Sequence, residues 1–195
     1  LFLSDNGGAG NGGNAPLRGQ KTTMWEGGLR VPFLAWWPGR IPAGTSSSAI
    51  TANLDLLPTL AHLAGAGSPA GRRLDGVDIS ASLLGAASPG ARREYLYFRG
   101  LDLEAVRADA WKLHLARGEL YHLGEDPGEA RDVAGQHPEV VSRLRAIAAA
   151  NATDLGNTGV GPSCRPLGRI EAPQPLLAAD GTVRADAIGP RPRFP

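Results

Sequence analysis

Two oxygen-bearing side chains follow the first apolar run of the sequence. Residues 1–4 (LFLS) predict a short β-strand, and Asp5 and Asn6 come directly after it. Carboxylate and carboxamide oxygens are hard ligands suited to Ca²⁺ or Mg²⁺, and open α/β sheets bind ligands at the carboxyl ends of their strands. Residues 5–8 (DNGG) also have the composition of a plain turn. Residues 5–8 are therefore compatible with a metal site and with a plain turn.

The second candidate is Lys21, one of only two lysines in the chain, the other being Lys112. A lysine ammonium is a compact cation that can hold an anionic group and donate a proton to a leaving oxygen. Lys21 follows a glycine- and asparagine-rich segment over residues 7–20, whose length is typical of a functional or a disordered loop. A solvated surface lysine explains the same residue, and Arg18 is open to the same two interpretations.

Several elements of the first half could position these side chains. Residues 29–37 (LRVPFLAWW) form a second apolar run, which predicts a buried strand with Pro32 at an edge or a bulge. Leucines at positions i, i+4 and i+7 predict a helix over residues 53–64, with Asp55 as its N-cap and Gly65 at its end.

The second half has a different pattern. Four short strand-like runs predict an antiparallel meander; they are residues 94–99, 104–108, 111–116 and 119–123. Helical periodicity follows over residues 138–150, with Pro138 at the first position, where its missing N–H costs little.

These elements predict an α/β fold with three parts. Residues 1–91 are expected to be the C-terminal part of a large α/β domain, because the chain begins inside a strand. Residues 92–150 are expected to form a small α+β subdomain, an antiparallel sheet with one packed helix. Residues 151–195 are rich in proline and glycine with little periodicity, which predicts an irregular tail.

Composition excludes several classes of protein. Twenty basic and nineteen acidic side chains leave a net charge of +1, so no long-range field recruits nucleic acid. A single cysteine rules out an internal disulfide framework and a multi-thiolate metal site. No apolar run reaches the roughly 18 residues of a membrane span. Composition carries no information on oligomeric state.

The order of several short motifs resembles the second half of a sulfatase. The motifs are residues 4–7 (SDNG), 17–21 (LRGQK), 26–32 (EGGLRVP), 35–39 (AWWPG), 55–60 (DLLPTL), 74–76 (LDG) and 120–129, which ends in DPGE. Each motif alone is weak, whereas the ordered set is specific. Over about residues 1–150, it resembles the arylsulfatase A and N-acetylgalactosamine-6-sulfatase branch of the alkaline-phosphatase-like superfamily.

The resemblance implies roles for individual residues. In such sulfatases the aspartate and asparagine of the SDNG motif bind a divalent cation, usually Ca²⁺, which maps to Asp5 and Asn6. The lysine before EGG contacts the sulfate ester and its bridging oxygen, which maps to Lys21, whereas Glu26 is expected to be structural. His114 resembles a position near the active-site mouth of related sulfatases, which makes it a candidate for the substrate rim.

The resemblance also implies an activity that this chain cannot complete alone. Sulfatases hydrolyse sulfate monoesters with a formylglycine made from Cys or Ser in a C-x-P-x-R motif or its Ala variant. Cys164 opens a similar stretch, but Gly168 stands where the motif needs arginine, so we assign Cys164 no catalytic role. The early aspartates of the metal site and the family's other basic residues are missing as well. We therefore expect the formylglycine upstream, and we expect this chain alone to be inactive.

Two alternative functions remain open from the sequence. The first is a phosphate or phosphonate ester hydrolase of the same superfamily, and the second is a non-catalytic sulfatase relic that serves as a binding module. The resemblance implies a small-molecule or carbohydrate sulfate ester as the substrate. By analogy with the family, it also implies an exported, periplasmic or lysosomal location.

Overall fold

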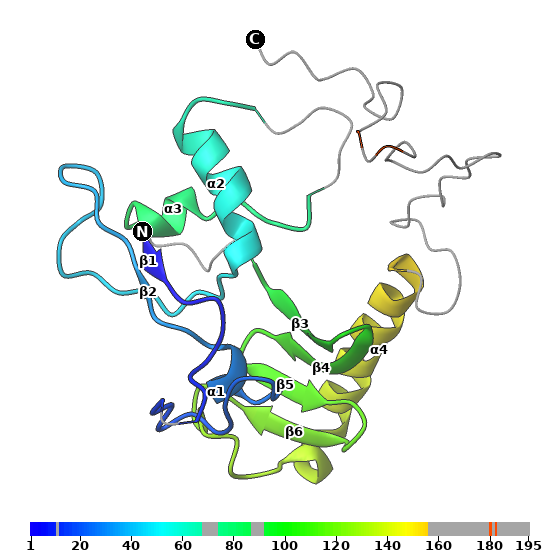
Figure 1. Ribbon diagram of the computed structural model, residues 1–195. Helices are drawn as coiled ribbons and strands as arrows, with labels where there is room; N and C mark the ends of the chain where they lie inside the picture. The colour runs from blue at the N-terminus through cyan, green and yellow to red at the C-terminus, as the bar shows by residue number, and fades with distance from the viewer. Residues whose placement is uncertain (11, 68–73, 87–91, 156–179, 181, 183–195) are drawn as a thin grey trace.

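The computed structural model describes residues 1–10, 12–67, 74–86, 92–155, 180 and 182. In chain order its elements are β1 (Phe2–Leu3), α1 (Glu26–Leu29), β2 (Phe33–Leu34), α2 (Leu56–Leu63), α3 (Ser80–Leu83), β3 (Glu94–Arg99), β4 (Asp102–Ala108), β5 (Trp111–His114), β6 (Glu119–His122) and α4 (Pro138–Asp154) (Figure 1). Two short 3₁₀ turns, Asn53–Asp55 and Ala134–Gln136, precede α2 and α4. The arrangement is a mixed α/β one, as expected.

Strands β3 to β6 form the antiparallel meander that the sequence predicts. The strands lie in the order β3-β4-β5-β6, and each pairs with its neighbour in the chain. The observed bounds differ from the predicted ones by at most two residues, because β4 begins at Asp102 and β5 ends at His114. A register shift between Tyr97 and Phe98 marks a bulge in β3, which bends that strand.

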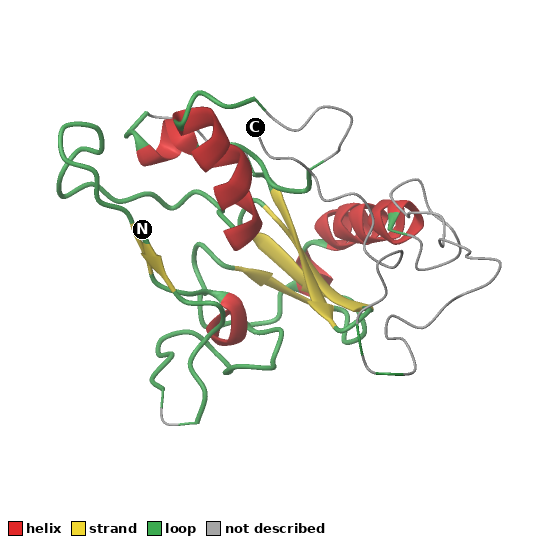
Figure 2. Ribbon diagram, turned by 45° about the horizontal axis from the view of Figure 1, so that its top comes forward, coloured by secondary structure: helices red, strands yellow, loops and turns green. Residues whose placement is uncertain are grey.

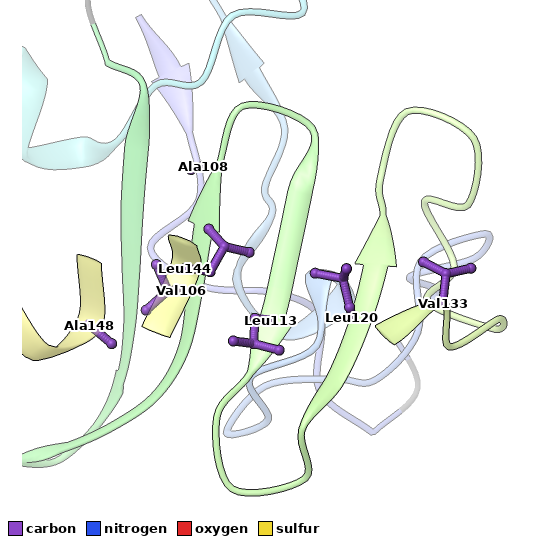
Figure 3. Packing of buried hydrophobic residues seen from close by; sticks show 7 residues of the cluster. All are labelled: Val106, Ala108, Leu113, Leu120, Val133, Leu144 and Ala148. Carbon is purple, nitrogen blue, oxygen red and sulfur yellow. The ribbon is translucent and has the colours of Figure 1, made fainter. Parts of the chain in front are cut away.

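One face of the meander packs against α4 (Figure 2). Side chains alternate between the two faces of a strand, and β4, β5 and β6 each contribute apolar side chains to the face that α4 covers. The buried cluster between sheet and helix consists of Val106, Ala108, Leu113, Leu120, Val133, Leu144 and Ala148 (Figure 3). This cluster is the main hydrophobic core of the described residues.

Helix α4 is longer than predicted. It continues past the expected end at Ala150 to Asp154, so the irregular tail does not begin at residue 151. The Asn151 side-chain amide donates to the Ile147 carbonyl at 2.9 Å, and the Leu155 N–H donates to the Asn151 carbonyl at 2.9 Å. These bonds continue the helix beyond Ala150, where the apolar pattern of the sequence is weaker. In the part of the chain that the structure describes, no helix is long and apolar enough to cross a membrane.

The opposite face of the meander is partly polar and meets the first part of the chain. Lys112 and His114 of β5 lie on this face, because Leu113 between them points into the α4 core. Met24 packs there against Tyr97 and Ala105. Residues 18–29, including α1, therefore cover this face of the sheet.

The first half differs from its prediction around residues 29–37. Only Phe33–Leu34 is a strand, and it pairs antiparallel with β1, whereas Leu29 ends α1. The sequence does not predict α1, because Gly27 and Gly28 are poor helix formers. Hydrogen bonds from its backbone to Glu129 and Arg18 hold this single turn.

The predicted helix over residues 53–64 is confirmed as a 3₁₀ turn followed by α2. Gly65, with a φ of +73°, ends it as expected. Asp55 flanks α2, but its buried carboxylate makes no hydrogen bond to the helix backbone. It accepts instead from the Ala52 and Val77 N–H groups and pairs with Arg92 at 2.5 Å. Asp55 therefore occupies the predicted N-cap position of α2. Its carboxylate caps the preceding 3₁₀ turn through the Ala52 N–H and joins separate segments, and it makes no capping hydrogen bond to α2 itself.

Candidate active-site segment

Backbone hydrogen bonds bring the three candidate motifs together. The Gly7 N–H donates to the Gly28 carbonyl at 2.9 Å, which ties the turn after β1 to α1. The Lys21 N–H donates to the Gly8 carbonyl at 3.0 Å, which ties the lysine to the same turn. Asp5, Asn6 and Lys21 therefore stand on backbone segments that are hydrogen-bonded to one another, although up to sixteen residues separate them in the sequence.

The close approach of these segments depends on Gly7. A Cβ added at this buried position would overlap the carbonyl oxygen of Gly27 and lie 2.8 Å from its carbonyl carbon. We expect Gly7→Ala to lower the free energy of unfolding by about 1–3 kcal/mol, the usual cost of overpacking. Gly13→Ala is the matched control, because a Cβ there meets no atom within 4 Å. Urea unfolding of both variants measures the difference, and an equal effect of the two would contradict the close approach.

The side chains of the candidate metal ligands lack protein partners. Within the described residues, neither the Asp5 carboxylate nor the Asn6 amide makes a hydrogen bond or an ion pair, and Asp5 is exposed. Two hard oxygen donors with free lone pairs fit two positions of a Ca²⁺ or Mg²⁺ coordination sphere. No group of three His, Cys, Asp or Glu side chains that could hold a metal ion occurs among the described residues. These two residues therefore suit part of a metal site and not a whole one.

Asp5 lines a cavity of about 530 Å³ between the first half of the chain and the meander. Neither Asn6 nor Lys21 lines it. Lys21 is exposed, and in the described part of the chain its side chain makes no hydrogen bond or ion pair. The ammonium is therefore available to an anionic ligand. The roles of Asp5, Asn6 and Lys21 stay predictions.

A buried ionic cluster lies between α1 and the meander. Lys112 is 0% exposed, and its Nζ lies 3.0 Å from Glu26 Oε1 and 2.9 Å from Glu129 Oε1. The same ammonium lies 4.2 Å from the centroid of the Tyr97 ring. Because Lys112 is fully enclosed, it neutralises buried carboxylates and cannot touch a substrate.

Both carboxylate oxygens of Glu129 are engaged. Its Oε1 accepts from Lys112 and lies 2.9 Å from His114 Nε2, and its Oε2 accepts from the Glu26 N–H at 2.6 Å. His114 is 6% exposed and its ring lies 4.1 Å from the ring of Trp25. The structure thus places His114 between Glu129 and Trp25, while the predicted role at the substrate rim stays a prediction.

The cluster shifts the pKa values of its members. Burial raises the pKa of the Glu26 carboxyl, but the charge and hydrogen bond of Lys112, the hydroxyl of Tyr97 and the charge of Arg107 outweigh it, so this pKa is lowered. Burial, together with the neighbouring Glu26, raises the pKa of the Tyr97 hydroxyl well above its ordinary value. Glu26 is therefore ionised and Tyr97 is protonated at neutral pH, as the hydrogen bond from Tyr97 to Glu26 at 2.8 Å requires.

The family resemblance implies a structural role for Glu26, and its contacts agree with that expectation. The sequence does not single out Lys112 as its partner, and it shows Glu129 only as the end of a motif. A signal was available, because Lys112 sits in a strand between apolar residues and a buried lysine needs a counter-ion. The identity of that counter-ion depends on folding, since Glu26 is 86 residues away.

Comparison with known proteins finds similarity to sulfatases. Residues 1–66 match the profile of the sulfatase family. N-Acetylgalactosamine-6-sulfatase of Sus scrofa is 31% identical over 187 residues, which cover 75% of this chain and 35% of the relative. Arylsulfatase G of Homo sapiens is 54% identical over 166 residues, which cover 72% of this chain and 32% of the relative.

Comparison of the fold with solved structures also finds similarity to a sulfatase. The crystal structure of PsFucS1 sulfatase from Pseudoalteromonas sp. superimposes with a TM-score of 0.69 and 26% identity, covering 77% of this chain and 36% of that one. The chain spans about a third of the length of the curated relatives that it matches.

Proposed function

Since this chain belongs to the sulfatase family, we propose that it takes part in the hydrolysis of sulfate monoesters. The observation that carries the proposal is the pair of backbone hydrogen bonds that joins the Asp5 turn to Lys21 and to α1. This region lies within the 66 residues that match the family profile. The comparisons do not favour a phosphate or phosphonate hydrolase or a non-catalytic relic.

Asp5 and Asn6 are proposed to hold a divalent cation, Ca²⁺ by preference. Their oxygens have no competing protein partners among the described residues, which suits them to this role. When bound, such a cation supplies positive charge against the oxygens of a sulfate group. Within this chain, the tie from Gly7 to Gly28 keeps the turn that carries both side chains in place.

Lys21 is proposed to contact the sulfate ester directly. Its ammonium can offset negative charge on the sulfate oxygens and donate a proton to the bridging oxygen as the alcohol leaves. The free ammonium and the fixed backbone support this role together, since a general acid must be both available and positioned. No step is assigned to Cys164, which lies outside the described residues.

A sulfated carbohydrate is the proposed substrate class. The relative of Sus scrofa is named for a sulfated amino sugar, and this chain shares 31% of its residues with it over the aligned part. The roles proposed for Asp5, Asn6 and Lys21 would be the same for the sulfate ester of a simpler alcohol.

The reaction class is tested with the protein expressed from its complete gene. We expect Ca²⁺-dependent release of sulfate from a sulfate monoester, and a much slower release of phosphate from the phosphate ester of the same alcohol. Faster hydrolysis of the phosphate ester would indicate the related phosphatase. Binding of the sulfate ester without any hydrolysis would indicate the relic.

Asp5→Ala is expected to weaken the metal site. Losing one charged oxygen ligand should raise the Ca²⁺ concentration for half-maximal activity by at least about tenfold. Titration of the chelator-treated protein with Ca²⁺ measures this shift. Asp102→Ala is the control, because Asp102 is also exposed but lies at the start of β4. An unchanged Ca²⁺ requirement in Asp5→Ala would remove Asp5 from the site.

A further inference from the structure

We propose that Glu129 is a positioning residue for Lys21, holding the turn that carries this lysine from both sides. The proposal rests on the proposed function for the role of Lys21 itself. Glu129 belongs to the loop after β6 and is more than a hundred residues away from Lys21 in the sequence. Its two contacts with the first part of the chain fall on opposite sides of Lys21.

The first contact lies before Lys21, at Arg18. The Arg18 Nη1 donates to the Glu129 carbonyl oxygen at 3.0 Å. The guanidinium also lies 3.7 Å from the ring centroid of Trp25, within the range of a cation–π interaction. The Arg18 carbonyl in turn accepts from the Gly27 N–H at 2.7 Å. Arg18 therefore ties the start of the turn both to Glu129 and to α1.

The second contact lies after Lys21, at Glu26. The Glu129 Oε2 accepts from the Glu26 N–H at 2.6 Å, so the first residue of α1 is bound to the same glutamate. Trp25, just before it, stacks on His114, which also contacts Glu129. The turn from Arg18 to Glu26 is thus closed at both ends by one residue.

Glu129 is itself held in one position. It is 0% exposed, and Lys112 and His114 both contact its Oε1. Its φ of +51° lies in the left-handed region, which few residues other than glycine adopt and which persists only where the surroundings fix it. A fixed carboxylate and a fixed carbonyl give the Lys21 turn two fixed attachment points.

The turn between the two contacts is tight. Gly19 and Thr22 both have positive φ values, +83° and +76°, and the Thr23 side chain bonds to the Gln20 backbone at 2.7 Å and 3.1 Å. Such a turn has little conformational freedom, so we expect a displacement at either end to move Lys21. Because the Lys21 side chain makes no hydrogen bond or ion pair in the described residues, the backbone sets where this side chain begins and which region its ammonium can reach.

The test compares Glu129→Gln with Glu125→Gln in the protein expressed from its complete gene. Glutamine nearly matches glutamate in shape but removes the charge that holds Lys112, and its single oxygen cannot accept both from Lys112 and from the Glu26 N–H. Glu125 follows β6 as well, but its side chain is 69% exposed, which makes it the matched control.

The kinetic readout uses two sulfate esters whose alcohols differ in acidity. Nitrophenolate leaves without a proton, whereas a sugar alkoxide needs the proton that Lys21 is proposed to donate. Glu129→Gln should lower kcat/KM for the sugar sulfate by about 10- to 100-fold and that for nitrophenyl sulfate much less. An equal fall for both esters would indicate a loss of folded protein and would overturn the proposal.

Hydrogen exchange gives a readout that does not need activity. The Lys21 N–H is bonded to the Gly8 carbonyl, and in Glu129→Gln its exchange should accelerate at least about tenfold more than that of the β5 amides, which report the stability of the meander. Unchanged exchange at Lys21, or an equal acceleration in β5, would each overturn the proposal. If the exchange result holds and the wild type hydrolyses no sulfate ester, the proposed function fails and the positioning role of Glu129 stands.

Discussion

Replacing Lys21 with methionine is expected to lower kcat/KM for a sugar sulfate by about 10²–10⁴-fold, the usual contribution of a positioned acid–base group. Methionine matches the unbranched aliphatic part of the lysine side chain but carries no charge and no proton to donate. The leaving alkoxide would then depart without protonation, and the sulfate oxygens would lose one compensating charge. Initial rates of sulfate release by the protein from its complete gene measure the effect.

The fall in kcat/KM caused by Lys21→Met should depend on the leaving group of the ester. It should not arise from a loss of folded protein. The exposed Lys21 side chain makes no hydrogen bond or ion pair in the described part of the chain, so the free energy of unfolding should match that of the wild type. Arg131→Met is the matched control, because this exposed cation lies 3.9 Å from Glu125 and far along the chain from the candidate site. A fall of less than about tenfold for the sugar sulfate would exclude Lys21 as the general acid.

Replacing the other lysine should affect stability. Lys112→Met leaves the carboxylates of Glu26 and Glu129 buried without the ammonium that both contact. Removing one partner of a buried ion pair costs about 3–5 kcal/mol, because the remaining charge is uncompensated. Urea unfolding of the wild type and of Lys112→Met measures the difference in the free energy of unfolding.

A double-mutant cycle isolates the contact between Lys112 and Glu26. Glu26→Gln should lower the free energy of unfolding by less in the Lys112→Met background than in the wild type. In that background Lys112 is already absent, so the substitution removes no favourable contact with it. The difference should be about 0.5–3 kcal/mol. Additive effects of the two substitutions, or a loss below about 1 kcal/mol in Lys112→Met, would contradict the proposed importance of the cluster.

The pH dependence of the same variants gives the sign of the interaction. Although burial raises the Glu26 pKa, Lys112 and the other partners lower it on balance. A lowered carboxyl pKa stabilises the fold above the pKa of the unfolded chain, and this stabilisation is lost as the pH falls towards the folded pKa. The gap in stability between the wild type and Lys112→Met should therefore narrow in acid. A gap that widens there would contradict the account.

Elements with a strong local pattern could be predicted from the sequence. The four strands of the meander and helices α2 and α4 have clear periodicity, and the structure confirms each of them. The errors fall where local preference and tertiary contact disagree. Helix α1 forms despite Gly27 and Gly28, because Glu129 and Arg18 bind its backbone.

The residues of the candidate site also differ in how far the sequence alone could identify them. Asp5, Asn6 and Lys21 stand in short motifs, so residue type and order were enough to single them out. The groups that hold the surrounding backbone could not be found so easily. The bond from Arg18 to Glu129 spans 111 residues, and the one from Lys112 to Glu26 spans 86. Only the folded chain shows which of its many charged residues meet.

Asp5, Asn6 and Lys21 are proposed to act together on one sulfate ester. The most direct measurement is a crystal structure of the protein from its complete gene with Ca²⁺ and a sulfate ester bound. We expect oxygens of Asp5 and Asn6 at about 2.3–2.6 Å from the cation and the Lys21 Nζ within hydrogen-bond distance of the ester. A cation bound by other residues, with the Lys21 ammonium directed away from the sulfate group, would contradict the claim.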